Sequence, residues 1–426
     1  VAVATGSLAL VLFLDAVNLP VDGLRQRWRT PVLDLGPGTL LTIGGVALAA
    51  HLLLHVGLVP SLLLGAVLAS TDPIVLRDVL RNPGIPRSMR QLLTLEAGMN
   101  DIVVLPVVLV LIAVGQAQIS GAAGWVGFLA QLLLLSPLLG LLVGGVGAWL
   151  MGQADARYSI RREYQALYGI GLVLAAYAGA QAVGADGFLA AFFGGLAVNL
   201  FDVTLCDCFL EYGEVTAEMA MLLTFLLFGA ALSTLFGLIA FLPALALAVV
   251  VIVIVRPLAL SLVLVRARLS AAGRVFLGWF GPRGLSSLLL ALLVVEAGTP
   301  GAVRLFAVTG VVVLVSTIVH GVSATPGTAW YVRHVARALL TPAEERESTA
   351  DGLFAHDQDA VPRLTPAELA MQLAGDQPPV VLDVRTRGQY DQDQGQIPNS
   401  VRVLPDQLRD WARTADRKRA VVAYCT

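Results

Sequence analysis

The chain has 426 residues, of which 57% are apolar and 14% charged, and its formal net charge at pH 7 is −2. A soluble globular protein carries about 25% charged residues, so this composition excludes an ordinary soluble protein and indicates one that crosses a membrane several times. The nearly balanced charge implies no general attraction to nucleic acid, and three cysteines do not indicate a disulfide framework.

Eleven apolar segments occupy the first 323 residues, and each is long enough, or nearly so, to cross a hydrocarbon core of about 30 Å as a helix. We therefore expect an all-α polytopic membrane protein. The chain begins inside an apolar run, so we also expect residues upstream of Val1. The eleven segments span residues 1–19, 38–58, 61–80, 92–115, 124–151, 165–183, 186–203, 217–236, 239–265, 275–297 and 303–323.

Basic residues are concentrated in four of the five alternate connections between these segments, and the fifth, 204–216, is acidic. Arginines occur in the connections 20–37, 81–91, 152–164 and 266–274, whereas the intervening connections contain almost no basic residue. By the positive-inside rule the arginine-rich connections face the cytoplasm. The sequence therefore predicts a multi-pass protein of the cell membrane (inner or plasma membrane), surrounded by the lipid bilayer, with its polar C-terminal part in the cytoplasm.

The third apolar segment contains Thr71-Asp72-Pro73. A carboxylate at mid-membrane costs roughly 2.5–3.5 kcal/mol even on insertion scales, and proline removes a backbone donor from the helix. Two unfavourable features at one point indicate a broken helix whose freed backbone groups line a polar cavity.

The next segment opens with a second polar group, Glu96, Asn100 and Asp101. Arg256 lies inside another apolar segment and needs a counter-charge, for which Glu96 is the obvious candidate, with Asn100 as a hydrogen-bond partner. Asp72 and Asp101, if unpaired, could exchange a proton for a cation. The alternative is that these acids and arginines only pair with one another to hold the helices together.

Gly281-Pro282-Arg283-Gly284 interrupts the tenth segment in the same way. Two interrupted segments in corresponding halves of a membrane protein indicate an inverted-repeat transporter that works by alternating access. Arg283 could steady the carbonyl groups freed by a break, or an acid such as Asp72.

The motifs Thr71-Asp72-Pro73, Glu96-x-x-x-Asn100-Asp101, Arg256-Pro257 and Gly278-Trp-Phe-Gly-Pro-Arg283-Gly284 together resemble the monovalent cation:proton antiporter family of the NhaP/NHE type, over residues 1–330. The resemblance implies an inverted-repeat antiporter fold of about thirteen helices, with two broken helices that cross, and a homodimer. The eleven segments found here would then lack the first two helices.

The resemblance also assigns roles to single residues. Asp72, with Thr71 of its motif, and Asp101 would bind cation and proton in competition, and Glu96 would pair with Arg256. An Asn-Asp pair, where electrogenic relatives have Asp-Asp, implies electroneutral exchange. No cofactor or bound metal is implied; the transported ions are H⁺ and a monovalent cation, Na⁺ first and K⁺ as the alternative.

The sequence departs from the family pattern at two positions, and both concern the ion. Ala97 replaces a serine that often follows the glutamate, and Asp15 is the nearest match to an acid two helices earlier. Asp15 is therefore a candidate extra ligand or an acid of the access path.

Residues 331–360 are expected to form a linker. The sequence of residues 361–426 predicts a separate α/β domain, with a helix starting near Thr365 and strands at 379–385 and 420–424. Leu382-Asp383-Val384-Arg385, Tyr390 and Gly395-Gln396-Ile397-Pro398 resemble a rhodanese-like domain, here truncated. The resemblance implies that Cys425, after the last strand, would carry a persulfide. The alternative is a buried, inert cysteine.

Two further functions stay open at this point. The chain could be a membrane-anchored sulfurtransferase with Cys425 as its nucleophile. It could also be an antiporter that its tail gates in response to sulfide or redox state. The intramembrane acids favour cation/proton exchange over both.

Overall fold

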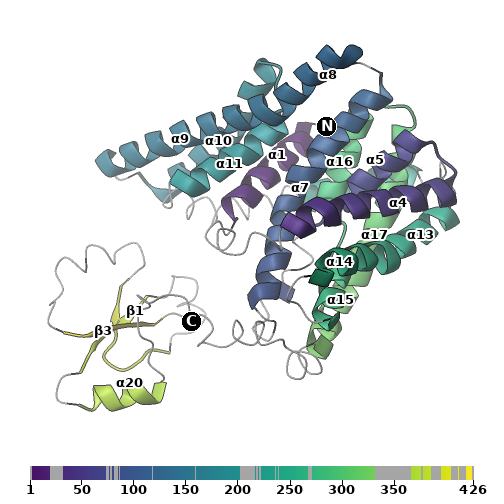
Figure 1. Cartoon of the computed structure of the whole chain (residues 1–426). Coiled ribbons are helices and arrows are strands. Elements are labelled where there is room, and N and C mark those ends of the chain that lie inside the picture. The colour runs from purple at the N-terminus through teal and green to yellow at the C-terminus, as the bar shows by residue number, and fades with distance from the viewer. Residues whose placement is uncertain are drawn as a thin grey trace. The chain divides into compact units, whose positions relative to one another are not determined.

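The structure is a computed structural model of the whole chain, in which the two parts Val1–Leu353 and Phe354–Thr426 are compact units (Figure 1). We describe each unit by itself. The residues that the structure describes are 2–19, 32–72, 76, 79–80, 85, 87–117, 119–158, 160–201, 216, 219, 222–235, 237, 239–266, 271–331, 366–375, 378–384, 395–403, 411 and 419–424.

The described part of the first unit is mostly helical. Its labelled α-helices are α1 (Ala2–Val17), α4 (Thr39–Leu54), α5 (Leu58–Ala69), α7 (Arg87–Gly115), α8 (Gly121–Ala130), α9 (Ser136–Tyr158), α10 (Arg162–Ala182), α11 (Gly187–Phe201), α13 (Phe241–Val250), α14 (Arg256–Val263), α15 (Ala271–Trp279), α16 (Leu285–Glu296) and α17 (Ala302–Tyr331). Leu222–Leu235 is a further apolar helix. Short stretches of π- or 3₁₀-helix join some of them, namely η1 (Asp34–Gly38), η3 (Gln131–Leu135), η5 (Val251–Val255) and η6 (Leu264–Arg266).

One group of helices is formed by α1, α9, α10 and α11, with α11 in contact with the other three (Figure 1). Small residues allow these helices to approach closely, which is how membrane helices commonly associate. A Cβ atom on Gly144 of α9 would fall against the backbone of Gly194 on α11, and one on Gly140 would fall against Ala190. These glycines therefore fix the distance between the two helices.

The second group surrounds α5 and contains the two interrupted helices. Within it, α4 packs on α5 and α13, α5 on α7, α14 on α15, and α16 on α17. Helix α1 contacts α7 and α16, so the two groups meet along α1. Asp15 of α1 therefore belongs to the first group of helices and faces the second.

The two predicted interruptions are present as breaks in the helices. Helix α5 ends at Ala69, and residues 70–72 have no helical structure. Helix α15 ends at Trp279, residues 280–284 are not helical, and α16 starts at Leu285. Pro282 cannot donate a backbone hydrogen bond, so it favours this second interruption.

Proline also explains a local widening of the helix that carries Arg256. The π-helical turn η5 ends one residue before Arg256-Pro257. The ring of a proline clashes with the carbonyl group four residues earlier, and a widened turn relieves that clash. A similar turn, η3, precedes Ser136-Pro137.

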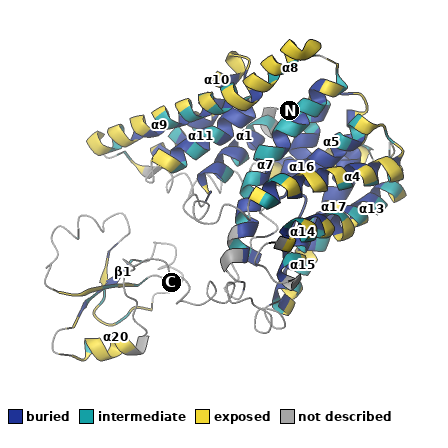
Figure 2. Cartoon of the chain, in the orientation of Figure 1, coloured by how far each residue is buried: buried dark blue, intermediate teal, exposed yellow. Residues whose placement is uncertain are grey.

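Five helices of the described part are long and apolar enough to cross a membrane, by length and composition: Asp34–Leu54, Leu92–Gly115, Gly121–Tyr158, Phe241–Val263 and Ala302–Tyr331. Shorter apolar helices overlap other predicted segments, including the two half-helices α5 and α16. The number of eleven spans therefore stays a prediction. Figure 2 shows exposed positions along α8 and α9, and these include leucines and Trp149, as expected for a lipid-facing surface.

The second unit contains α20 (Pro366–Leu373) and a parallel three-stranded sheet in the order β2 (Val401–Arg402), β1 (Val380–Asp383) and β3 (Val421–Tyr424). The predicted helix and the two predicted strands are thus present. The buried carboxylate of Asp383 accepts a hydrogen bond from the Tyr424 hydroxyl at 3.0 Å. Arg385, Tyr390 and Cys425 lie outside the described residues, so the likeness to a rhodanese-like domain and the role of Cys425 stay predictions.

Candidate functional site

The two helix breaks cross, and Asp72 lies at the crossing. Its backbone amide donates to the Pro282 carbonyl at 3.0 Å, and its side-chain Oδ2 accepts the amide hydrogen of Leu285 at 2.7 Å. Leu285 is the first residue of α16, so the Asp72 carboxylate caps the positive end of that half-helix. Asp72 is only 3% exposed.

Arg283 makes the reciprocal contact at the end of the other half-helix. Its Nη1 donates to the carbonyl oxygens of Ala69 and Ser70 at 3.0 and 3.2 Å. These carbonyls belong to the last turn of α5, which has no following helical residues to donate to them. The Ser287 hydroxyl adds a bond to the Ser70 carbonyl at 3.3 Å. Each broken helix is therefore capped by a charged residue of the other.

Glycine at two positions makes this approach possible. A Cβ atom at Gly284 would overlap the Asp72 carboxylate, and one at Gly281 would overlap the Arg256 guanidinium. Both glycines belong to the four-residue motif that interrupts the tenth segment, so the motif provides the space for two charged side chains as well as the break.

Asp101 of α7 lies next to the end of α5. The Ser70 hydroxyl donates to Asp101 Oδ1 at 2.6 Å, and the Ser286 hydroxyl also hydrogen-bonds Asp101. Asp15 of α1 is close enough to Asp101 and Asp72 for the three charges to interact. The structure thus gathers three carboxylates, of which Asp72 and Asp101 are buried and Asp15 is half-buried. Ser70 and Ser286 were not identified from the sequence, where short polar residues of an apolar helix give no signal.

The Asn100 side chain is placed differently from the sequence-based expectation. Its amide donates to the Ala69 carbonyl at 2.7 Å and to the Thr71 hydroxyl at 3.4 Å, and it accepts from the Thr39 hydroxyl at 3.2 Å. Asn100 therefore supports the end of α5 rather than the predicted ion pair. Glu96 and Asn100 are four residues apart and share a helix face, which suggested the predicted role, but the end of α5 also reaches Asn100.

Glu96 and Arg256 form an ion pair in the interior, with Nη2 and Oε1 2.6 Å apart and both side chains less than a tenth exposed. A third charged residue, Asp34, is 2% exposed and interacts electrostatically with both of them. From the sequence, Asp34 is expected in the connection before the second segment, because the apolar run starts at residue 38. The helix instead begins with the turn η1 at Asp34.

The arrangement has a definite chemical capacity. Buried carboxylates that face one another need a positive charge nearby, because water cannot stabilise them. The guanidinium of Arg283 contacts carbonyl oxygens, and that of Arg256 contacts Glu96. A proton or a metal cation bound at the carboxylates of Asp72 and Asp101 would reduce their negative charge. Pro73, which the sequence placed at this break, lies outside the described residues.

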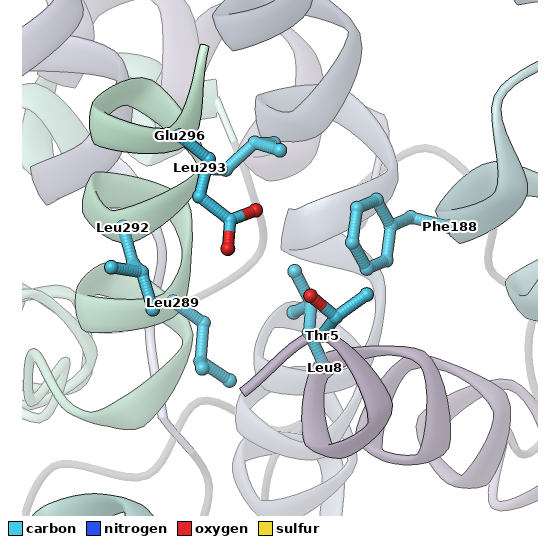
Figure 3. Close-up of a pocket in the computed structure, with 7 residues that line it drawn as sticks. All are labelled: Thr5, Leu8, Phe188, Leu289, Leu292, Leu293 and Glu296. Atoms are coloured by element: carbon cyan, nitrogen blue, oxygen red, sulfur yellow. The ribbon is translucent and has the colours of Figure 1, made fainter. Parts of the chain in front are cut away.

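A small pocket lies between α1, α11 and α16 (Figure 3). It is lined by Thr5, Leu8, Phe188, Leu289, Leu292, Leu293 and Glu296. The carboxylate of Glu296, at the end of α16, points into this pocket towards α1. The pocket adjoins the helix that carries Asp15, and its only charged lining residue is an acid.

Buried acids at the crossing of two broken membrane helices are typical of secondary transporters. The model of the family "Sodium/hydrogen exchanger, transmembrane" matches residues 3–330, so the chain belongs to this family.

Named relatives agree with that assignment. A K(+)/H(+) antiporter NhaP of Alkalimonas amylolytica is 30% identical over 342 residues, which cover 78% of this chain and 58% of the relative. A K(+)/H(+) antiporter NhaP2 of Shewanella sp. (strain MR-4) is 29% identical over 325 residues, which cover 73% and 55%. The chain thus spans little more than half the length of these relatives.

The fold is similar to that of a solved structure, the sodium proton antiporter MjNhaP1 from Methanocaldococcus jannaschii at pH 8. The TM-score is 0.65 with 21% sequence identity, and the match covers 79% of this chain and 85% of that chain. The likeness shows that the fold is that of this antiporter, and the inverted repeat expected from the sequence stays a prediction.

Proposed function

We propose that this chain exchanges a monovalent cation for H⁺ across a membrane, with both ions competing for the carboxylates of Asp72 and Asp101. The observation that carries the proposal is the placement of these two buried carboxylates: Asp72 lies at the crossing of two half-helices, and Asp101 accepts a hydrogen bond from Ser70 at the end of one of them. Buried acids inside a membrane domain are costly, so their presence points to a role in ion transfer.

The oxygen atoms gathered at the site suit a hard cation. Asp101 contributes a carboxylate, Ser70 and Thr71 contribute hydroxyls, and Asp72 contributes a second carboxylate that also caps α16. In the proton-loaded state one carboxylate would hold the proton, and in the cation-loaded state the same oxygens would hold the cation. The site would then carry one ion or the other, which gives electroneutral exchange.

The identity of the cation is part of the proposal. The sequence-based argument favoured Na⁺ with K⁺ as the alternative, whereas the two relatives above are named K(+)/H(+) antiporters. We therefore propose that the site accepts a monovalent alkali cation and that Na⁺ and K⁺ be tested side by side.

Alternating access would move the site from one membrane side to the other. We propose that the helices around α5 and α16 move against those around α11, because these two groups meet along α1, close to the carboxylates. The arginine-rich connections indicate which side is cytoplasmic, and the C-terminal domain would then also be cytoplasmic. A homodimer in the cell membrane fits the family resemblance.

The test is cation-driven dissipation of a pH gradient in vesicles that contain the full-length protein. A pH-sensitive dye reports the gradient while NaCl, KCl or choline chloride is added. We expect Na⁺ or K⁺ to collapse the gradient and choline to leave it intact. Asp72→Asn should abolish the response at equal protein content. A gradient that no alkali cation dissipates would contradict the proposal.

A further inference from the structure

Side chains of α17 bridge the break between α15 and α16. The Ser316 hydroxyl oxygen accepts the backbone amide hydrogen of Arg283 at 2.8 Å, on the α16 side of the break. His320 Nε2 lies 2.9 Å from the Trp279 carbonyl oxygen, on the α15 side. Ser316 and His320 are four residues apart and share one face of α17, so one helix face contacts both ends of the broken helix.

Both ring nitrogens of His320 take part in these contacts. A carbonyl oxygen can only accept, so His320 Nε2 carries a hydrogen and donates it to Trp279. His320 Nδ1 lies 2.8 Å from the Ser316 carbonyl oxygen and 3.1 Å from the Ser316 hydroxyl oxygen. Polar contacts therefore run from the Arg283 amide through Ser316 and His320 to the Trp279 carbonyl.

The burial of both side chains indicates that their polar contacts are part of the folded interior. Ser316 is 0% exposed and His320 is 1% exposed. A buried polar group without a partner is costly, so such groups are placed where partners exist. The indole of Trp279 adds a bond of 3.1 Å to Ser323, one turn further along α17. By contrast, the buried hydroxyl of Thr328 on the same helix has no hydrogen-bond partner among the residues that the structure describes.

We propose that Ser316 and His320 are positioning residues for the ion site. By holding the residues on both sides of the break, they set the place of Arg283 and Leu285. Arg283 in turn caps α5, and Leu285 donates to the Asp72 carboxylate. Ser316 and His320 touch none of the proposed ion ligands through the bonds described here and act through these two residues. The inference rests on the proposed cation/proton exchange.

The test compares Ser316→Ala, His320→Ala and His320→Gln with Thr328→Val as the matched control. Initial rates of cation-driven pH-gradient dissipation are measured in vesicles over a range of Na⁺ and K⁺ concentrations, and rates are normalised to the protein content. We expect the Ala variants to raise the apparent KM for the cation at least severalfold. His320→Gln keeps a donor that can reach the Trp279 carbonyl and should recover part of the affinity. Thr328→Val should match wild type.

The KM separates positioning from folding, because a folding defect lowers the amount of active protein and leaves the KM of the remainder unchanged. An unchanged KM in both Ala variants would overturn the inference. A second readout does not depend on transport: hydrogen–deuterium exchange of peptides covering residues 280–285 should be faster in Ser316→Ala and His320→Ala than in Thr328→Val. If the wild-type protein transports no cation, the proposed function fails. Equal hydrogen–deuterium exchange rates in all variants would overturn the present inference separately.

Discussion

The carboxylate of Asp72 accepts the backbone amide hydrogen of Leu285 at 2.7 Å, although the two residues are 213 positions apart in the chain. An acid at the candidate ion site therefore also caps a half-helix. The reciprocal cap by Arg283 on Ala69 and Ser70 closes the crossing. Under the proposed function, binding of an ion at Asp72 would be coupled to the contact between the two half-helices, and this coupling would give a route from ion binding to helix movement.

Substituting Asp72 with Asn or with Ala distinguishes the role of its negative charge from its role as the cap of α16. Asp72→Asn keeps an oxygen that can accept from Leu285, so we expect loss of transport with a nearly unchanged thermal midpoint in detergent. Asp72→Ala also removes the cap, and loss of a helix cap costs about 0.5–2 kcal/mol. We therefore expect a lower midpoint for Asp72→Ala than for Asp72→Asn. Equal midpoints would show that the bond to Leu285 contributes no stability.

Substitution of Arg283 tests the reciprocal cap. Arg283→Met removes the donor to two buried carbonyl oxygens, and a buried group that loses its partner costs about 1–3 kcal/mol. Thermal unfolding of the solubilised protein should show this loss. The control is Arg304→Met, because Arg304 is exposed and makes a single bond of 3.5 Å to the Leu54 carbonyl at the end of α4. A similar loss in both variants would argue against a special role for Arg283.

The ion pair of Glu96 and Arg256 predicts an asymmetry, because Asp34 also interacts with Arg256. Removing one partner of a buried ion pair costs about 3–5 kcal/mol. Arg256→Met leaves two buried acids without their cation, whereas Glu96→Gln leaves Arg256 beside Asp34. We expect Arg256→Met to lower the thermal midpoint more. A larger drop of the thermal midpoint in Glu96→Gln would mean that Asp34 does not stabilise Arg256.

The pocket beside α1 predicts an effect of Glu296 on ion entry. Its carboxylate should raise the local cation concentration at low ionic strength, and this effect is screened as salt increases, since the Debye length is about 10 Å at 0.1 M. Glu296→Gln should therefore raise the apparent KM for the cation at low salt and match wild type when choline chloride is added. The measurement is the same gradient assay at two ionic strengths. If Glu296→Gln raises the apparent KM equally at both ionic strengths, this role of Glu296 is contradicted.

Local sequence signals predicted the two breaks and the ion pair of Glu96 with Arg256. A carboxylate next to proline, and glycines around Pro282, are unfavourable in a membrane helix, so both breaks could be inferred from single segments. Arg256 lies in an apolar segment and needs a negatively charged partner, and the apolar segments contain few acidic residues. Each of these conclusions follows from the free-energy cost of placing a single residue in its own membrane helix.

Contacts between distant segments could not be predicted from periodicity. The bonds from Arg283 to the end of α5 and from Ser316 to the Arg283 amide depend on how the half-helices cross. Asn100 was placed with Glu96 because both lie on one helix face, and the structure shows that the end of α5 occupies its amide. Asp34 was missed because the helix extends beyond the apolar run.

The competition of a cation and a proton for Asp72 and Asp101 is tested most directly by proton release on cation binding. The full-length protein is purified in weakly buffered detergent, NaCl or KCl is added, and the released protons are measured beside cation binding. We predict that cation binding releases protons in wild type and that Asp101→Asn abolishes both signals, with choline chloride releasing none. Cation binding to wild type without any proton release would contradict the central claim.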